Sequence, residues 1–184
     1  MERVTDPPNS VWLVGLSGGG KSTVGPLLAA RLGYDFVDLD EYVEEVEGTT
    51  VSELFAEGER RFREAEARAS ERLLTRPHLV VATGGGWMAR HDIRREAAGC
   101  VRVWLRVSPV AAFDRLAGGA ADRPLLAGRD GRARLLELAG AREAAYGEAE
   151  IIVDTDDLSP HQVADEVARG LIEAGWRPGR DEGS

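Results

Sequence analysis

A single lysine lies in a glycine-rich segment that matches the phosphate-binding pattern G-x-x-x-x-G-K-[ST]. The segment runs from Gly15 to Ser22, with Lys21 at the lysine position, and the other 22 basic residues of the chain are arginine. An ammonium is a compact point charge that fits between β- and γ-phosphate oxygens, whereas a planar guanidinium forks onto its target. The choice of lysine here therefore favours binding of nucleotide phosphates.

The residues on both sides of this segment predict the elements that such a loop requires. Residues 11–14 are a short apolar run, typical of a buried strand, and residues 22–32 have a helical pattern. Glycines allow the backbone to direct N–H groups inward, and the helix N-terminus faces the anion. An ordinary glycine-rich turn is disfavoured because strand, loop, Lys-Ser and helix occur in the required order. The ATP-binding residues expected from the loop are Gly18, Gly19, Gly20, Lys21, Ser22 and Thr23, with Ser22 also placed to ligate magnesium.

Two aspartates end the second predicted strand, residues 34–38, with Leu39 between them. Side chains alternate along a strand, so both carboxylates share a face while the strand continues. Beside a phosphate loop, Asp38 could hold magnesium through water, and Asp40 could accept a proton from an attacking hydroxyl. The alternative is a solvated turn before an acidic helix start. The position after a phosphate loop favours the functional interpretation.

Two further motifs could contact a ligand. Arg63 and Glu66 are three residues apart in a charge-dense segment, so the glutamate could orient the arginine, although a solvated helix with ion pairs is the simpler interpretation. A triplet, Gly84 to Gly86, follows a buried strand at 78–83, and glycines allow close backbone approach to a ligand. The triplet could instead serve a loop with unusual backbone angles. Thr83 stands where many phosphate-loop enzymes have a magnesium-binding aspartate, which shifts the metal role to Asp38.

The whole chain alternates between strand and helix patterns. This alternation predicts a parallel sheet covered on both faces, with ligands at the carboxyl ends of the strands. We expect one domain over 1–184, with a substrate-binding insertion at 39–72 that carries two helical patterns, a lid at 118–128, and frayed ends at 1–9 and 177–184. The expected strands are 11–14, 34–38, 78–83, 101–107 and 150–154, and the expected helices 22–32, 59–75, 89–97, 109–117, 129–147 and 160–175.

Composition excludes several classes of protein. A chain of 184 residues with 43% hydrophobic residues suits one globular domain. The net charge of −9 argues against a nucleic-acid surface, and no apolar run is long enough to span a membrane or resembles a signal peptide. Cys100 is the only cysteine, which fits a reducing cytoplasm, and we expect it to be buried at a strand edge. His78, His91 and His161 are not at ligand spacing, so no zinc site is expected.

Together and in this order, the motifs resemble those of shikimate kinase, from about residue 11 to residue 171. The resemblance rests on the phosphate loop with Lys21-Ser22, Asp38-Leu39-Asp40, Gly58-Glu59 with Phe62-Arg63-Glu64-Ala65-Glu66, the glycine triplet, Arg123-Pro124-Leu125-Leu126, and Arg142 with Tyr146. It implies an α/β P-loop kinase of the nucleoside-monophosphate-kinase type, with a five-stranded parallel sheet and a lid.

The resemblance also implies an activity and a set of contacts. ATP, with Mg2+, would phosphorylate the 3-hydroxyl of shikimate on the route to chorismate and the aromatic amino acids. The enzyme would be a cytoplasmic monomer whose partners are ATP and shikimate, with no nucleic acid and no membrane. Arg63 and Arg142 would hold the carboxylate of shikimate, and Arg123 on the lid would reach the phosphates of ATP. The implied catalytic residues are Lys21, Asp40 and Arg123, and the implied shikimate contacts are Asp40, Arg63, Gly84, Gly85, Gly86 and Arg142.

Some positions depart from the family. Leu39 stands where threonine is common, Ala144 replaces a frequent proline, and the register of Arg115 against the adenine-contacting arginine is ambiguous. Trp87, after the triplet, would report on substrate binding, or else pack under the following helix. Trp12 and Trp104 should be buried, with Trp176 near the frayed end.

Other functions stay open at this point. A related small-molecule kinase such as gluconate kinase would share the fold and the loop. A catalytically silent kinase-like scaffold should show damage at Lys21, Asp40 or the arginines, and the sequence shows none. A regulatory GTPase is disfavoured, because its Asn-Lys-x-Asp motif needs a second lysine.

Overall fold

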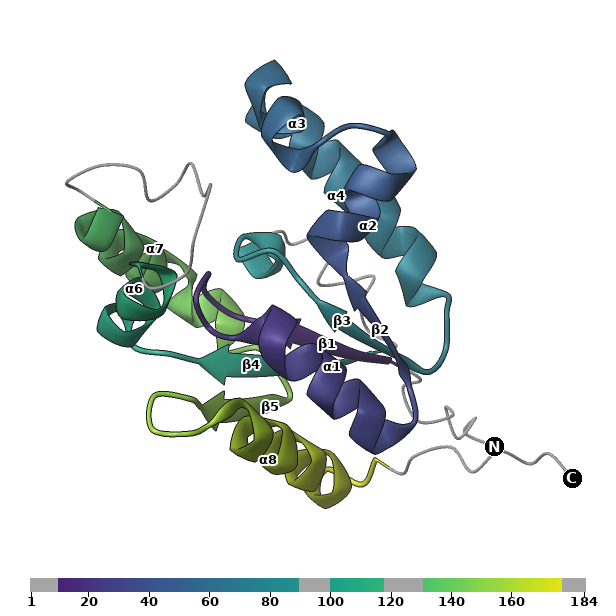
Figure 1. Ribbon diagram of the computed structural model, residues 1–184, viewed down its shortest axis with the longest axis vertical. Helices are drawn as coiled ribbons and strands as arrows, with labels where there is room; N and C mark the ends of the chain where they lie inside the picture. Colours follow the sequence, from purple (N-terminus) through teal and green to yellow (C-terminus); the bar gives the residue numbers. More distant parts are fainter. Residues whose placement is uncertain (1–9, 90–99, 118–130, 177–184) are drawn as a thin grey trace, which may run out of the picture.

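The computed structural model describes residues 10–89, 100–117 and 131–176. Within them, five strands and a series of helices follow the expected alternation (Figure 1). The strands are β1 (Ser10–Val14), β2 (Asp35–Asp38), β3 (Leu79–Ala82), β4 (Val101–Arg106) and β5 (Ile151–Asp154). The helices are α1 (Lys21–Leu32), α2 (Leu39–Glu47), α3 (Val51–Glu57), α4 (Glu59–Leu74), the short 3-10 helix η1 (Trp87–Ala89), α6 (Pro109–Ala117), α7 (Gly131–Tyr146) and α8 (Pro160–Glu173).

The strands form one sheet in the order β2-β3-β1-β4-β5, and every neighbouring pair is parallel. The fold class expected from the alternation is therefore confirmed. In the register, Leu13 pairs with Ala82 on one side and with Val103 on the other. Because β1 is central, the loop after it opens at the carboxyl edge between β3 and β4, where the chain after β3 also emerges.

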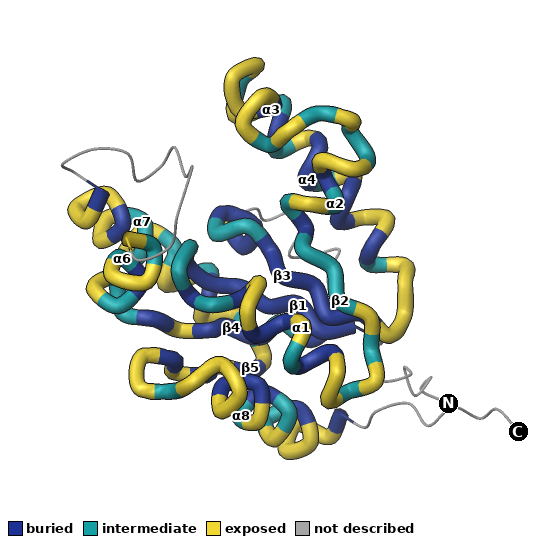
Figure 2. The backbone as a smooth tube through the Cα atoms, in the orientation of Figure 1, coloured by how far each residue is buried: buried dark blue, intermediate teal, exposed yellow. Residues whose placement is uncertain are grey.

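Two apolar cores lie on opposite faces of the sheet, because successive strand residues point to opposite sides. Val11 and Leu13 pack with α1 and α8, whereas Trp12 and Val14 pack with α2, α4 and α7. Figure 2 shows β1, β3 and β4 as the dark, mostly buried centre and the outer turns of the helices as exposed. Burial on both faces explains why the strand sequences are nearly continuous apolar runs.

The insertion after β2 contains three helices, α2, α3 and α4, where the sequence analysis expected two. A capping box explains the extra helix start: the Thr50 side chain accepts from the Glu53 amide, and the Glu53 carboxylate accepts from the Thr50 amide. Glu47 then joins α2 to α4, since Arg61 and Arg68 both donate to its carboxylate, at 2.8 and 2.7 Å. The three helices form the upper part of Figure 1.

Cys100 and Trp176 are both buried in the structure. Cys100 is buried as expected, and burial raises the pKa of its thiol to about 12. Trp176, expected near the frayed C-terminal end, is buried against Tyr34, with ring centroids 5.6 Å apart. The lid, and the helix expected at 89–97 beyond its first residue, lie outside the described residues. No described helix is long and apolar enough to cross a bilayer.

Candidate active site

The phosphate loop joins β1 to α1, as the sequence predicted. Gly15, Gly18 and Gly20 have φ values of 135°, 83° and 86°, which favour glycine. Space is also restricted, because a Cβ added at Gly18 would lie 2.6 Å from the Ala112 carbonyl oxygen of α6. Lys21 is buried, and its Nζ donates to the carbonyls of Gly15 and Leu16, both at 2.8 Å. The loop thus holds one positive charge at the N-terminus of α1, where an anion is already favoured.

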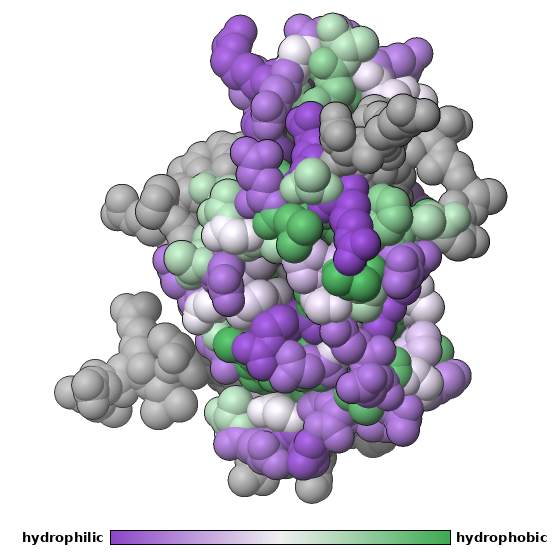
Figure 3. Space-filling view, turned by 90° about the vertical axis from the view of Figure 1, so that its left-hand side faces the viewer, coloured by the Kyte–Doolittle hydropathy of each residue, from purple (hydrophilic) through white to green (hydrophobic). Residues whose placement is uncertain are grey.

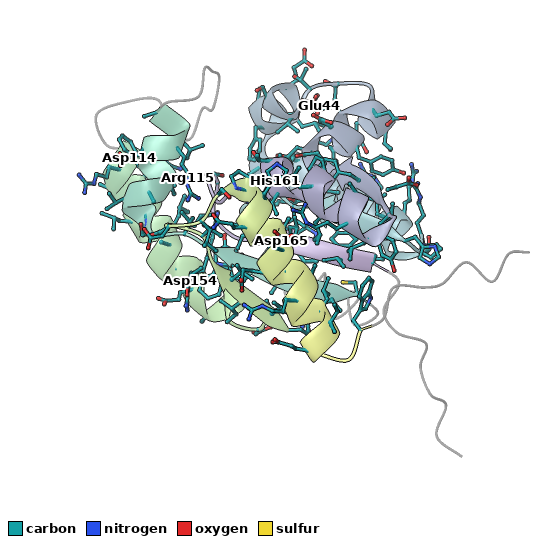
Figure 4. All side chains as sticks on the ribbon, turned by 60° about the horizontal axis from the view of Figure 1, so that its bottom comes forward. Glu44, Asp114, Arg115, Asp154, His161 and Asp165 are labelled. Atoms are coloured by element: carbon teal, nitrogen blue, oxygen red, sulfur yellow. The ribbon has the colours of Figure 1, made fainter. Side chains whose placement is uncertain are left out.

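A cavity of about 420 Å³ adjoins this loop. One wall consists of residues 18–24, and the opposite wall includes Arg115, Thr155, Leu158 and Pro160. The Arg115 guanidinium donates to the Thr155 carbonyl at 2.6 Å, which fixes its position at the cavity. Figure 4 labels Arg115 near His161, at the start of α8. Arg115 therefore lines the cavity beside the phosphate loop.

Asp38 connects the phosphate loop to the start of α2. Its Oδ2 accepts a hydrogen bond from the Ser22 hydroxyl at 2.6 Å, and its Oδ1 accepts from the Asp40 amide at 3.0 Å. The second bond makes Asp38 the N-cap of α2. The strand therefore ends at Asp38, and the expected alternation does not reach Asp40, which lies in the first helical turn. The Asp38 carboxylate therefore faces the phosphate loop, whereas the Asp40 carboxylate faces the glycine triplet.

Each glycine of the triplet lies against a different polar side chain. A Cβ added at Gly84 would lie 3.0 Å from Glu66 Oε1 and 3.4 Å from Asp40 Oδ1. One added at Gly85 would lie 3.3 Å from Arg142 Nη1, and one at Gly86 would lie 2.5 Å from Arg63 Nη2. The fold thus brings together the substrate-binding residues that the resemblance implied. We call this set the glycine-triplet cluster: Asp40, Arg63, Glu66, Gly84, Gly85, Gly86 and Arg142.

The glycine-triplet cluster also touches the phosphate loop. A Cβ at Gly85 would lie 3.3 Å from the backbone nitrogen of Ser17. The loop after β3 and the loop after β1 therefore approach each other directly, with the backbone of one against the backbone of the other. A ligand held by the cluster would lie next to a phosphate held by the loop. Sequence reasoning did not single out Ser17, because only the paired loops reveal its position.

Arg63 is held in place by Glu66, as its spacing suggested. Arg63 Nη1 donates to Glu66 Oε2 at 2.9 Å, and the Glu66 side chain is fully buried. The guanidinium carbon also lies 5.1 Å from the centre of the Phe62 ring, within the range of a cation–π contact. The alternative of a solvated helix holds one turn away, where Arg60 and Glu64 form an exposed pair. The ion pair at Glu66 is thus largely buried, whereas the neighbouring pair on α4 is exposed.

Tyr146 supports the triplet from α7. Its hydroxyl donates to the Gly85 carbonyl, and its ring is buried 5.5 Å from the ring of Trp104. Burial raises the pKa of Tyr146 above its usual 10.0, and Arg142 opposes this shift. Sequence reasoning noted Tyr146 only as part of a family motif. Its spacing of four from Arg142, one helical turn, is the signal that could have placed both side chains at the triplet.

Thr83, Trp87 and Arg123 complete the predicted set. Thr83 binds the Leu13 carbonyl through its hydroxyl at 3.0 Å and its amide at 3.1 Å, so it joins β3 to β1. Trp87 is fully buried and stacks on Trp12 of β1, with ring centroids 4.9 Å apart; the following helix, under which it was expected to pack, lies outside the described residues beyond Ala89. Arg123 lies outside the described residues. Among those residues, no group of three or more His, Cys, Asp or Glu side chains could hold a metal ion.

Comparison with known proteins decides between the remaining families. The family model for shikimate kinase matches residues 17–171. A shikimate kinase of Gloeobacter violaceus is 45% identical over 88% of this chain and 92% of its own, and one of Symbiobacterium thermophilum is 44% identical over 91% and 99%. The chain belongs to the shikimate kinase family. It is an ATP-using kinase that phosphorylates shikimate.

Solved structures agree with membership of the shikimate kinase family. Shikimate kinase from Acinetobacter baumannii, in complex with shikimate, has a TM-score of 0.86 and 30% identity, covering 94% of this chain and 97% of that one. A gluconokinase from Sinorhizobium meliloti reaches a TM-score of 0.65 at 23% identity, which shows a shared fold alone. The expected fold, of the nucleoside-monophosphate-kinase type, is confirmed.

Proposed function

We propose that the phosphate loop and the glycine-triplet cluster hold ATP and shikimate on either side of the contact between Ser17 and Gly85. The observation that carries this proposal is the approach of Asp40, Arg63 and Arg142 to three consecutive glycines beside the loop. Two arginines suit a carboxylate, since charge-assisted hydrogen bonds are the strong ones. Asp40 supplies an acceptor for the proton of the 3-hydroxyl.

ATP would fill the cavity beside the loop. Its phosphates would meet the backbone of residues 18–20, Lys21 and the N-terminus of α1, while the base and ribose would occupy the space between Arg115 and Pro160. Lys21 would exchange its two carbonyl contacts for phosphate oxygens and stabilise the charge that develops on transfer. Arg123 is proposed to add a second positive charge from the lid.

The side chains at the loop fit Mg2+ as the metal. The Ser22 hydroxyl and the Asp38 carboxylate lie 2.6 Å apart, and both offer the oxygen ligands that Mg2+ prefers. Ser22 would bind it directly and Asp38 through water. When bound, Mg2+ neutralises charge on the β- and γ-phosphates. The rest of the step belongs to the protein: Arg63 and Arg142 orient shikimate, and Asp40 takes the proton of the hydroxyl that attacks the γ-phosphorus.

We further propose a cytoplasmic monomer that binds neither nucleic acid nor membranes. The net charge of −9 supports the last two points, because it disfavours binding to the anionic surfaces of nucleic acids and membranes. On the face that carries α6 and α7, hydrophilic and apolar groups are interspersed rather than segregated (Figure 3). Sedimentation analysis would test the monomer.

The decisive experiment measures ADP release with shikimate, quinate and gluconate as acceptors, each with and without a chelator. Shikimate should support turnover with the highest kcat/KM, and the chelator should abolish it. Equal turnover with gluconate would contradict the acceptor assignment. Turnover that persists after chelation would contradict the role proposed for Ser22 and Asp38.

A further inference from the structure

A buried hydrogen bond connects the glycine triplet to α4. The indole nitrogen of Trp87, directly after the triplet, donates to the Ser70 hydroxyl at 3.0 Å. The same hydroxyl donates to the Glu66 carbonyl at 2.7 Å. Trp87 is itself held by Trp12 of β1, since the two indoles stack at 4.9 Å with 22° between their planes. A chain of contacts therefore runs from the central strand through Trp87 and Ser70 to Glu66.

This chain of contacts ends at the residues that face the substrate. Glu66 and Arg63 lie one and two turns before Ser70 on α4, and they pack against Gly84 and Gly86. The contact at Gly86 is tight, because even a Cβ there would lie 2.5 Å from Arg63 Nη2. A small displacement of α4 along its axis would therefore move the guanidinium relative to the triplet backbone.

Around Ser70, the core-facing side of α4 carries small side chains, whereas the larger Phe62 and Leu73 lie nearer its two ends. Ala65 and Ala69 present small, smooth surfaces to the core, and apolar burial is non-directional. A hydrogen bond instead requires a narrow range of distance and angle. Losing its acceptor would also leave the Trp87 N–H buried without a partner, which is unfavourable. The bond to Ser70 is thus a buried, directional contact between α4 and the loop that follows β3.

We propose that Ser70 and Trp87 are positioning residues for shikimate binding. Their hydrogen bond sets the position of Arg63 along the axis of α4 relative to Gly86, and therefore the position of the shikimate carboxylate that Arg63 binds. The inference rests on the proposed role of Arg63 and deepens it. Both side chains are fully buried, at 1% and 0% exposure, so they act through Arg63 and the triplet rather than on the substrate. The affinity for ATP, which binds on the other side of the Ser17–Gly85 contact, should not depend on Ser70 or Trp87.

The test is steady-state kinetics of Ser70→Ala, with Ser70→Thr as the rescue and Ala69→Gly as the control. Ser70→Ala should raise the KM for shikimate about fivefold to tenfold, or about 1.0–1.4 kcal/mol, with kcat and the KM for ATP within about twofold. Ser70→Thr keeps the hydroxyl and should restore the KM. Ala69→Gly weakens the same helix at a neighbouring buried position without touching the bond, so its KM should stay at the wild-type value while its Tm falls.

A second variant approaches the bond from the other side. Trp87→Phe keeps an aromatic ring against Trp12 but removes the N–H donor, so it should raise the same KM. The double variant should be no worse than the more affected single variant, because both remove one interaction. In an Arg63→Ala background, Ser70→Ala should add nothing to the KM. If Ser70→Ala does not fold, the same test can be made with Trp87→Phe and with the double variant Trp87→Phe/Arg63→Ala.

Two results would overturn the inference. One is a KM for shikimate in Ser70→Ala equal to that in Ala69→Gly. The Trp87–Ser70 hydrogen bond would then stabilise the fold without positioning Arg63. The other is additive effects of Ser70→Ala and Arg63→Ala. Failure of the proposed role of Arg63 would look different, since Arg63→Ala alone would then leave the KM for shikimate at the wild-type value.

Discussion

The phosphate loop and the glycine-triplet cluster meet where Ser17 lies against Gly85, but they are assembled in different ways. The loop uses residues 15–23, mostly through backbone groups, and one lysine that is bonded to the loop's own carbonyls. The cluster gathers side chains from α2, α4, α7 and the segment after β3. The functional groups of the loop therefore come from one contiguous segment, whereas the cluster depends on the packing of helices that are distant in sequence. Substitutions in the two regions should therefore change different quantities: the rate of phosphoryl transfer, the affinity for ATP, or the position of shikimate.

The largest effect is expected at Asp40, in the glycine-triplet cluster. Asp40→Asn keeps the shape of the side chain but cannot accept a proton, so kcat should fall by roughly 10²–10⁴-fold. ATP affinity should hardly change, because Asp40 faces Gly84 rather than the loop. Single-turnover kinetics with a nucleotide-binding assay measure both. A kcat near that of wild type would make Asp40 a binding residue only.

Lys21→Arg tests the loop alone. The larger guanidinium must fit a buried position where Nζ now lies 2.8 Å from two carbonyls, so the loop should distort despite the conserved charge. Removing a group that stabilises developing charge costs about 3–4 kcal/mol, on the order of a hundredfold to a thousandfold in rate. ATP binding should weaken, while shikimate binding persists. Activity within about threefold of wild type would contradict the need for an ammonium.

The arginines test the cluster alone. Arg142→Ala should raise the KM for shikimate on the order of tenfold to a hundredfold, the equivalent of one hydrogen bond to a charged group, with the Kd for ATP unchanged. Arg63→Ala should do the same but also lower Tm, because it removes a partner of the buried Glu66. An analogue without the carboxylate is the control. If both variants lost as much affinity for the analogue, the carboxylate assignment would be wrong.

The smallest effect is expected at Tyr146, whose hydroxyl donates to the Gly85 carbonyl, and it is a pH-dependent effect on the free energy of unfolding. Because burial raises the pKa of Tyr146 in the folded state above 10.0, its contribution to stability is complete below pH 10.0 and is lost as pH rises through the folded pKa. Tyr146→Phe should lower the free energy of unfolding by about 0.5–1.5 kcal/mol at neutral pH, with a shallower decline in alkali. Urea unfolding across pH measures this. Parallel pH profiles for the two proteins would exclude titration of Tyr146 as the cause.

The same contrast explains what the sequence could predict. Lys21, Ser22 and the glycines of the loop are contiguous, so pattern and chemistry together located them. The parallel sheet was predictable because its strands are short, mainly apolar runs between helical patterns. The convergence on Gly84 to Gly86 rested on family resemblance, since no spacing in the chain reveals which helices cross. Ser17, Ser70 and the support from Tyr146 needed the tertiary contacts. The start of α2 at Leu39 was missed because a strand pattern does not show that Asp38 will cap a helix.

The burial of Lys21 has a consequence for anyone who handles this protein. Acylating reagents, cross-linkers and coupling resins generally react with dispersed surface amines, but this chain has one lysine side chain, and it lies inside the phosphate loop with 7% of its surface exposed. Modification of that side chain would coincide with loss of the nucleotide site, and bound ATP would shield it. Attachment chemistry for this enzyme is therefore better directed to carboxylates, which the chain carries in excess.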